Sequence, residues 1–220
     1  MEGISQEAIS MAGHWNLNKL IVLWDDNGIS IDGSVDIAAS DDQLARFMAS
    51  GWDVSSCDGH NADEVAEAIE AARNSDKPSL IACRTVIGFG APNKQGTSGV
   101  HGAPLGDDEI AAAREALGWS HAPFEIPQDV LNAWREAGSR GKGASAEWNS
   151  RLAGMDAAKQ ADFNLAISGE LPAGWQSAIN DHKKALSADA PAWATRKSSQ
   201  EALKVINPVL TSTIGGSADL

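Results

Sequence analysis

The sequence lacks the features that mark membrane, secreted and nucleic-acid-binding proteins. Its longest apolar run is far below the roughly 18 residues of a membrane-spanning helix. No basic stretch followed by an apolar segment opens it, as a secretory signal would. Basic residues are scarce, since 17 lysines and arginines stand against 30 aspartates and glutamates, for a net charge of -13. This balance argues against nucleic acid and against a polybasic membrane contact. We expect a soluble cytoplasmic protein.

Cysteine and tyrosine are also in short supply. The two cysteines, Cys57 and Cys83, are too far apart for a CxxC motif. They predict two buried, reduced thiols, as is usual in a cytosolic protein. Tyrosine is absent beside eight tryptophans, and we have no physical account of that. Hydrophobic residues make up 43% of the chain, which is enough for a core and argues against wholesale disorder.

The first half alternates apolar strands with amphipathic helices. Residues 4–16 place apolar side chains on one helical face, and residues 19–24 form an apolar run typical of a strand covered on both faces. The same order then repeats: a helix with a Ser40–Gln43 capping box, a strand at 52–55, a helix begun by Asn61 and Glu64, and a strand at 79–85. The order predicts an α/β fold, a parallel sheet with flanking helices on both faces.

The second half is richer in helical patterns. Acids in the first turn favour a helix from Asp107, and Pro127 marks another helix start. Residues 138–145 read as an exposed connection, residues 146–187 as helical, and residues 187–193 as a linker. Thr195 begins a further helix. Residues 208–220 resemble a strand reaching a glycine turn, the first elements of a second α/β domain that the sequence does not continue.

Two polar loops follow predicted strands, and this placement points to a site. Ligands of parallel sheets lie at the carboxyl ends of the strands, where "DDNGIS" and the glycine-rich stretch after residue 85 both fall. The side-chain amide oxygen of Asn27 and the main-chain carbonyl of Ile29 are ligands that a hard divalent cation accepts. The alternative is a plain turn with Asx hydrogen bonds, and the residues alone favour it.

The glycine-rich stretch and a later basic segment could each meet a phosphate. The glycines between 88 and 106 allow close backbone approach, and Lys94 and His101 could neutralise the charge. There is no GxxxxGK[ST], so this is not a P-loop. Arg196 lies in "TRKSSQ" at a helix start, which favours anions. The alternatives are a polar loop histidine and a solvated helix start; the remaining histidines, His60 included, are interpreted as structural or solvent-facing.

Taken together, these segments resemble transketolase over almost the whole chain. The matching stretches are "MEGISQEA", "KLIVLWDDNGISIDG", "DGHN", "KPSLIACRTVIGFGAPNKQGT", "VHGAPLGDDEI", "APFEIP", "TRKSSQ" and "GGSADL", in the family's order. The resemblance implies a homodimer that uses thiamine diphosphate with Mg2+ or Ca2+. It also implies transfer of a two-carbon ketol unit between sugar phosphates, such as xylulose 5-phosphate and ribose 5-phosphate, in the pentose phosphate pathway and the Calvin cycle. 1-Deoxy-xylulose-phosphate synthase shares the cofactor, but "HGAPLG" favours transketolase.

The resemblance also implies roles for particular residues. Asn27 and Ile29 correspond to ligands of the cation, and Ile31 to the apolar residue against the cofactor ring. His101 corresponds to a catalytic histidine that contacts the diphosphate and the reacting substrate. The remaining correspondences are Arg196 with an arginine that binds the sugar phosphate, Asp219 with an aspartate near the cofactor, and Glu2 with an acidic residue in a network between the two active sites.

The chain departs from the family pattern in what it lacks. The family's Gly-Asp-Gly motif, which supplies a third metal ligand, and the cofactor-activating glutamate have no match here. The resemblance divides the chain into part of the diphosphate-binding domain at 1–145, a helical linker at 146–194, and the start of a truncated pyrimidine-binding domain at 195–220. We therefore expect a transketolase fragment with little or no activity alone. The alternatives are one chain of a split enzyme and a non-catalytic remnant.

Overall fold

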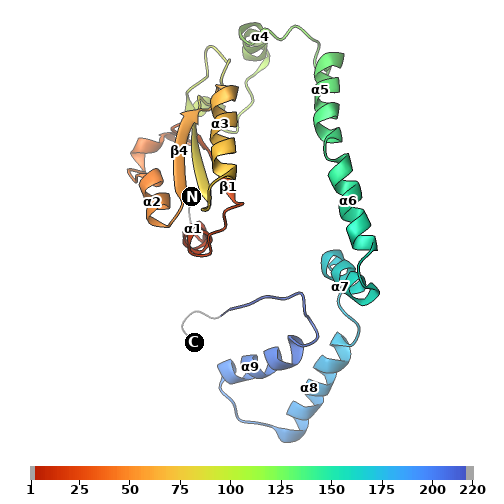
Figure 1. Cartoon of the computed structure of the whole chain (residues 1–220). Helices are drawn as coiled ribbons and strands as arrows, with labels where there is room; N and C mark the ends of the chain where they lie inside the picture. The colour runs from red at the N-terminus through yellow and green to blue at the C-terminus, as the bar shows by residue number, and fades with distance from the viewer. Residues whose placement is uncertain (1–2, 217–220) are drawn as a thin grey trace. The chain divides into compact units, whose positions relative to one another are not determined.

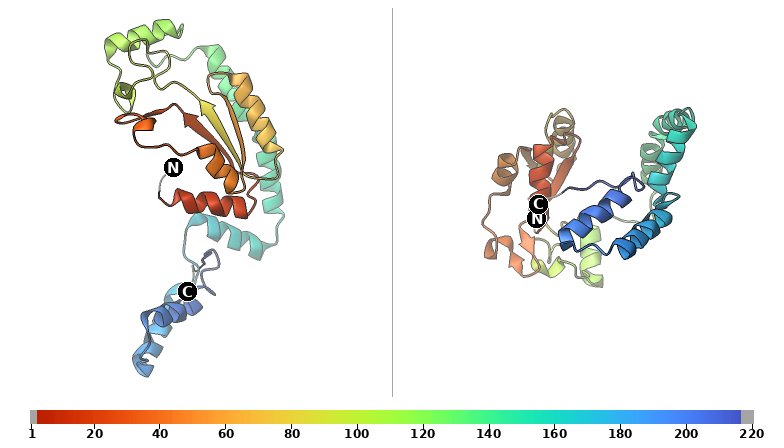
Figure 2. Two further views of the ribbon diagram at one scale, coloured as in Figure 1. Left: turned by 90° about the vertical axis from the view of Figure 1, so that its left-hand side faces the viewer. Right: turned by 90° about the horizontal axis from the view of Figure 1, so that it is seen from below.

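A parallel sheet lies at the centre of the N-terminal part of the chain (Figure 1). In the computed structural model, which describes residues 3–216, its strand order is β1 (Ile21–Asp26), β5 (Ser79–Arg84) and β4 (Asp53–Asp58). The strands run in register, with Asp26 opposite Arg84 and Arg84 opposite Asp58. They therefore end at the same edge of the sheet, as the arrowheads of β1 and β5 show in Figure 2, left.

Helices cover both faces of this sheet, because successive apolar side chains of β5 point alternately to one face and to the other. Leu80 packs with Phe47 and Trp52 on one face, under α1 (Ser5–His14) and α2 (Gln43–Ala49). On the other face, Ile81 and Cys83 pack against Ala72 of α3 (Ala62–Arg73). Successive side chains of a strand point to opposite faces, so β5, buried on both sides, is the core of this layer. The predicted α/β fold with flanking helices is confirmed.

Short elements complete this part of the chain. They are an antiparallel pair, β2 (Ile29–Ser30) and β3 (Gly33–Ser34), the short 3-10 helices η1 (Val35–Ile37) and η2 (Ser98–Val100), and α4 (Asp107–Ala116).

Helices alone form the regular structure of the described residues from 126 to 216. They are α5 (Gln128–Ser139), α6 (Lys142–Ala153), α7 (Ala157–Ser168), α8 (Trp175–Asp189) and α9 (Thr195–Ile206). The chain divides into two compact units between Glu125 and Ile126, and each is described by itself. The domain limits at 145 and 194 stay predictions. No helix within residues 3–216 combines the length and apolar character needed to cross a membrane.

Three local predictions were wrong, for physical reasons. Asp42, not Ser40, caps α2, since its Oδ1 accepts a hydrogen bond from Ala45 N at 2.9 Å. The expected connection at 138–145 is nearly all helix, because its glycines keep negative φ and only two residues separate α5 from α6. The described residues of the expected strand, 208–216, form turns and irregular segments rather than a strand, since the described part of this unit offers no strand to pair with.

Candidate active site at the carboxyl end of the sheet

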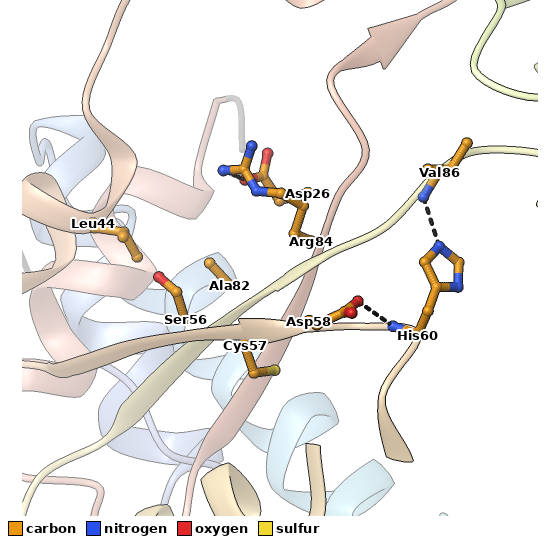
Figure 3. Close-up of a pocket in the computed structure, with 9 residues that line it drawn as sticks. All are labelled: Asp26, Leu44, Ser56, Cys57, Asp58, His60, Ala82, Arg84 and Val86. Carbon is orange, nitrogen blue, oxygen red and sulfur yellow. Dashed lines mark hydrogen bonds and ion pairs between the residues drawn. The ribbon is translucent and has the colours of Figure 1, made fainter. Parts of the chain in front are cut away.

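The two aspartates that end β1 bind the neighbouring strand. Asp25 accepts a hydrogen bond from the hydroxyl of Thr85, and Asp26 forms an ion pair with Arg84 at 3.1 Å. Figure 3 labels the side chains of Asp26 and Arg84. Arg84 is the last residue of β5, which lies beside β1, and Thr85 follows it directly. The side chains of Asp25 and Asp26 therefore hold the carboxyl ends of β1 and β5 together. Neither contact involves the residues that follow Asp26, which begin with Asn27.

The next residues form a tight polar turn. The Oδ1 atom of Asn27 accepts a hydrogen bond from Ile29 N at 2.9 Å, which is the Asx geometry that the sequence left as an alternative. Gly28 has a φ of +72°, a conformation that glycine adopts without strain, and its carbonyl accepts from Val35 N at 3.0 Å. An amide oxygen has two lone pairs, so Oδ1 can accept this hydrogen bond and still coordinate a cation.

A histidine ties the start of the second loop to β4. Nε2 of His60 accepts a hydrogen bond from Val86 N at 2.9 Å, and the ring stacks on Phe89 with centroids 4.0 Å apart. Asp58, the last residue of β4, accepts from His60 N at 2.9 Å. Figure 3 shows both bonds. These contacts agree with the prediction that His60 is structural, and they place the first residues of the glycine-rich loop over the sheet edge.

The glycine-rich loop then folds back on its own beginning. Gly96 N donates to Ile87 O at 2.8 Å. A Cβ on Gly88, whose φ is +67°, would lie only 3.0 Å from Val100 Cγ2, so the side chain of Val100 lies directly on the glycine. His101 follows Val100 and is exposed. The return of the chain thus brings the segment that carries His101 close to the end of β5, beside β1 and its Asn27 turn.

A buried carboxylate in α4 holds the middle of the loop. Glu109 is 7% exposed, and it accepts hydrogen bonds from Asn93 N at 2.8 Å, Asn93 Nδ2 at 2.9 Å and Lys94 N at 3.1 Å. The bond from the Asn93 side chain is the main cause that lowers the pKa of Glu109. The Nζ atom of Lys94, a predicted phosphate contact, donates to Leu105 O at 2.7 Å.

Sequence reasoning missed Glu109, because three acids begin α4 and only one of them is buried. A signal did exist in the spacing. Glu109 and Ala113 are one helical turn apart and are both buried, so Glu109 lies on the helix face that meets the loop.

An open hollow of about 520 Å3 lies against the strand ends. Figure 3 shows its lining, which includes the Asp26–Arg84 pair and Cys57. The Sγ atom of Cys57 is 3.7 Å from that of Cys83, and burial, reinforced by Cys57, raises the pKa of Cys83 to about 11. Both cysteines are free. Cys83 is buried as predicted, but Cys57 is only half-buried, because β4 is the last strand on its side of the sheet.

The second unit has a cationic cavity of its own. Arg196, in the first turn of α9, lines a cavity of about 930 Å3 together with Lys197 and Lys204. Both lysines pair with Glu201, at 2.7 and 2.8 Å. Their hydrogen bonds, that of Lys197 first, lower the pKa of Glu201 to about 2. The lysine charges are thus partly neutralised within the helix, whereas Arg196 is exposed.

The remaining predicted residues are less informative. Ile31 is 73% exposed, so its apolar side chain is open to a ligand. Glu2 and Asp219 lie outside the described residues. Within residues 3–216, no three His, Cys, Asp or Glu side chains group together as metal ligands.

Comparison with known proteins identifies the family. The family described as "Transketolase, thiamine diphosphate binding domain" matches residues 1–172, well over half of the chain. The chain belongs to the transketolase family. The match includes both loops at the sheet edge, and it ends within the second unit.

Individual transketolases are similar over the whole chain. The chain is 57% identical to the transketolase of Cereibacter sphaeroides and 51% identical to that of Rhodobacter capsulatus. Each match includes 100% of this chain and 33% of the relative. A solved transketolase from Pichia stipitis in complex with sedoheptulose 7-phosphate has a TM-score of 0.83 and 36% identity, again with 100% of this chain and 33% of that one covered. The chain thus spans about a third of the length of its relatives.

Proposed function

We propose that this chain supplies part of the active site for ketol transfer between sugar phosphates, with thiamine diphosphate and Mg2+ or Ca2+ as cofactors. The observation that carries the proposal is the shared edge of β1 and β5, where the Asn27 turn and the loop bearing His101 begin side by side. The family match extends over both loops. Solved relatives hold fructose 6-phosphate, sedoheptulose 7-phosphate and xylulose 5-phosphate, so phosphorylated sugars are the substrates that we propose.

The donor set fits a hard cation that would be held beside the diphosphate of the cofactor. In this proposal, the Oδ1 atom of Asn27 and the main-chain oxygen of Ile29 bind the cation, because Mg2+ and Ca2+ prefer oxygen ligands. The hydrogen bond from Ile29 N to Oδ1 prevents the Asn27 amide from rotating away. Two neutral ligands bind a cation weakly, since affinity rises with the number and charge of the ligands. Further ligands must come from the diphosphate, from water or from another polypeptide.

The other proposed residues act on the cofactor and the substrate. When bound, thiamine diphosphate supplies the nucleophilic carbon that carries the two-carbon unit. Ile31 packs against its ring, and His101 donates hydrogen bonds to the diphosphate and to the reacting part of the sugar. Arg196 binds the sugar phosphate, a role suited to an exposed guanidinium in the first turn of a helix. Glu2 and Asp219 keep their proposed roles in the dimer network and near the cofactor.

The placement of the cation can be tested without catalysis. Mn2+ substitutes for Mg2+ and broadens the NMR signals of nearby nuclei. With thiamine diphosphate and Mn2+ added, we expect broadening at residues 27–31, and its loss in Asn27→Ala. Asn180→Ala, in the second unit on α8, is the matched control and should leave the broadening unchanged. Broadening that survives Asn27→Ala, or that occurs only elsewhere, would refute the proposed ligands.

Activity of the isolated chain is a separate question. We expect no turnover of xylulose 5-phosphate with ribose 5-phosphate by the purified 220-residue chain, even at saturating cofactor, because the chain spans about a third of its relatives' length. Turnover above background would contradict this expectation. Activity that returns only with a second polypeptide would indicate a split transketolase. Homodimer formation, proposed by resemblance, is measured by sedimentation of the same sample.

A further inference from the structure

The carboxylate of Glu109 does not cap its own helix but accepts hydrogen bonds from a loop that is distant in the sequence. It is the third residue of α4, and a glutamate there commonly reaches back to the residue that caps its own helix. Here the cap is Gly106, which provides no side-chain cap, and Glu109 instead accepts from Asn93 and Lys94, 16 and 15 residues away. The helix start is thus used to bind a distant loop.

The contacts form a closed set around the segment that carries His101. Oε1 of Glu109 accepts from both main-chain amides, and Oε2 accepts from Asn93 Nδ2. Lys94 Nζ donates to Leu105 O at 2.7 Å, and Lys94 O accepts from Thr97 Oγ1 at 2.7 Å. In the sequence, His101 lies between Lys94 and Leu105, the two residues joined by the first of these hydrogen bonds. A buried carboxylate is retained at low cost only when its oxygens are hydrogen-bonded.

We propose that Glu109 is a positioning residue, which clamps residues 93–94 to the start of α4 and thereby sets the place of His101 over the sheet edge. Glu109 itself touches neither cofactor nor substrate in this assignment. Only the role of the clamp in positioning His101 for catalysis rests on the proposed function. Its existence is a property of the loop, and can be measured in the chain without any ligand.

Hydrogen exchange gives the direct readout. Asn93 N donates to Glu109, so Glu109→Ala should increase the exchange rate of this amide by about 10-fold or more, while amides in the core of β5 stay protected. The NMR signals of the His101 ring should shift or broaden in the same variant. Glu115→Gln, exposed on the same helix, is the control and should change neither.

Two conservative variants separate the clamp from general stability. In Glu109→Gln the amide oxygen can accept from both main-chain donors, and Asn93 can flip so that its own oxygen accepts from the new NH2 group. We expect near wild-type exchange and His101 signals. Asn93→Asp places a second carboxylate against Glu109 and should loosen the loop, whereas the pair Asn93→Asp with Glu109→Gln restores a donor and should restore protection.

The outcomes decide the proposal independently of cofactor chemistry. Unchanged exchange at Asn93 and unchanged His101 signals in Glu109→Ala would overturn it. If Glu109→Ala unfolds the unit, the comparison of Asn93→Asp with the double variant carries the test, and a failure of Glu109→Gln to rescue the loop would overturn the clamp. Loss of manganese broadening at residues 27–31 would instead count against the proposed function and leave the clamp intact.

Discussion

Gly13 packs against the end of α2 so closely that a single added methyl group should disrupt the first unit. A Cβ at this position would lie 1.7 Å from the carbonyl oxygen of Ser50, whereas real Cβ atoms essentially never approach other atoms below 3.0 Å. The obstacle is main chain and cannot rotate away. In Gly13→Ala, α1 must therefore withdraw from Ser50 by more than an ångström.

The cost follows from what α1 holds. Ile9 and Ala12 of this helix pack with Trp52, and the indole N–H of Trp52 donates to Ile9 O at 2.9 Å. Overpacking costs about 1–3 kcal/mol, and losing the indole hydrogen bond adds about 1 kcal/mol. Alanine returns about 1 kcal/mol through its better helix propensity. We expect the free energy of unfolding to fall by about 1–3 kcal/mol in total.

Hydrogen exchange at Leu80 and Ile81, the fully buried residues of β5, measures this free energy for the first unit alone. Gly99→Ala is the matched control, since its nearest neighbour is the movable hydroxyl of Thr97 at 3.4 Å, and we expect a change of at most about 0.5 kcal/mol. A Gly13→Ala variant as stable as the wild type would show that α1 does not lie against Ser50 as described.

Two further predictions concern titrating groups. The pKa of Glu201 is lowered to about 2 by Lys197 and then Lys204. Its contribution to the stability of α9 is therefore present above its unfolded value near 4.5 and is lost as the pH falls from there toward 2. The protection factors of the α9 amides, which are the ratios of intrinsic to observed exchange rate, should therefore fall over this range, and fall less in Glu201→Gln; an equal fall in both would contradict the pairing. The pKa of Cys83 is raised to about 11 by burial, so at pH 8 iodoacetamide should label Cys57 first, as mass spectrometry of the peptides would show; faster labelling of Cys83 would refute this. The stability due to the neutral Cys83 thiol should be lost only as the pH rises from 9 toward 11.

Where the sequence pattern was local, the predictions succeeded. The alternation of apolar strands with amphipathic helices predicted the sheet, and the Asn61 start of α3 is confirmed, with Oδ1 accepting from Asp63 N at 3.1 Å. Where several residues of one kind compete, the sequence could not choose. Ser40 and Asp42 are both good caps, and Asp42 is the one that bonds. The glycines at 138–143 suggested a loop, but helical φ values are open to glycine as well.

The candidate site shows the same division. The motifs identified Asn27, Ile29 and His101 as residues of interest, and the parallel register brings the loops that carry them to one edge. The roles of these residues stay proposals. The supports of the loops were not predictable: His60 reaches Val86 across 26 residues, and Glu109 reaches Asn93 across 16. Neither separation in the sequence corresponds to a helical or strand period, so no local pattern identifies these pairs.

The amino-acid sequence by itself determined the apolar faces of the strands and helices, the parallel direction of the strands and the family, because burial periodicity and motif spacing are properties of neighbouring residues. Only the tertiary structure decided which polar groups meet. Asp25 and Asp26 bind the end of β5 and Glu109 holds the glycine-rich loop, because a side chain's partner depends on strand register and on the path of a loop, which the whole fold sets.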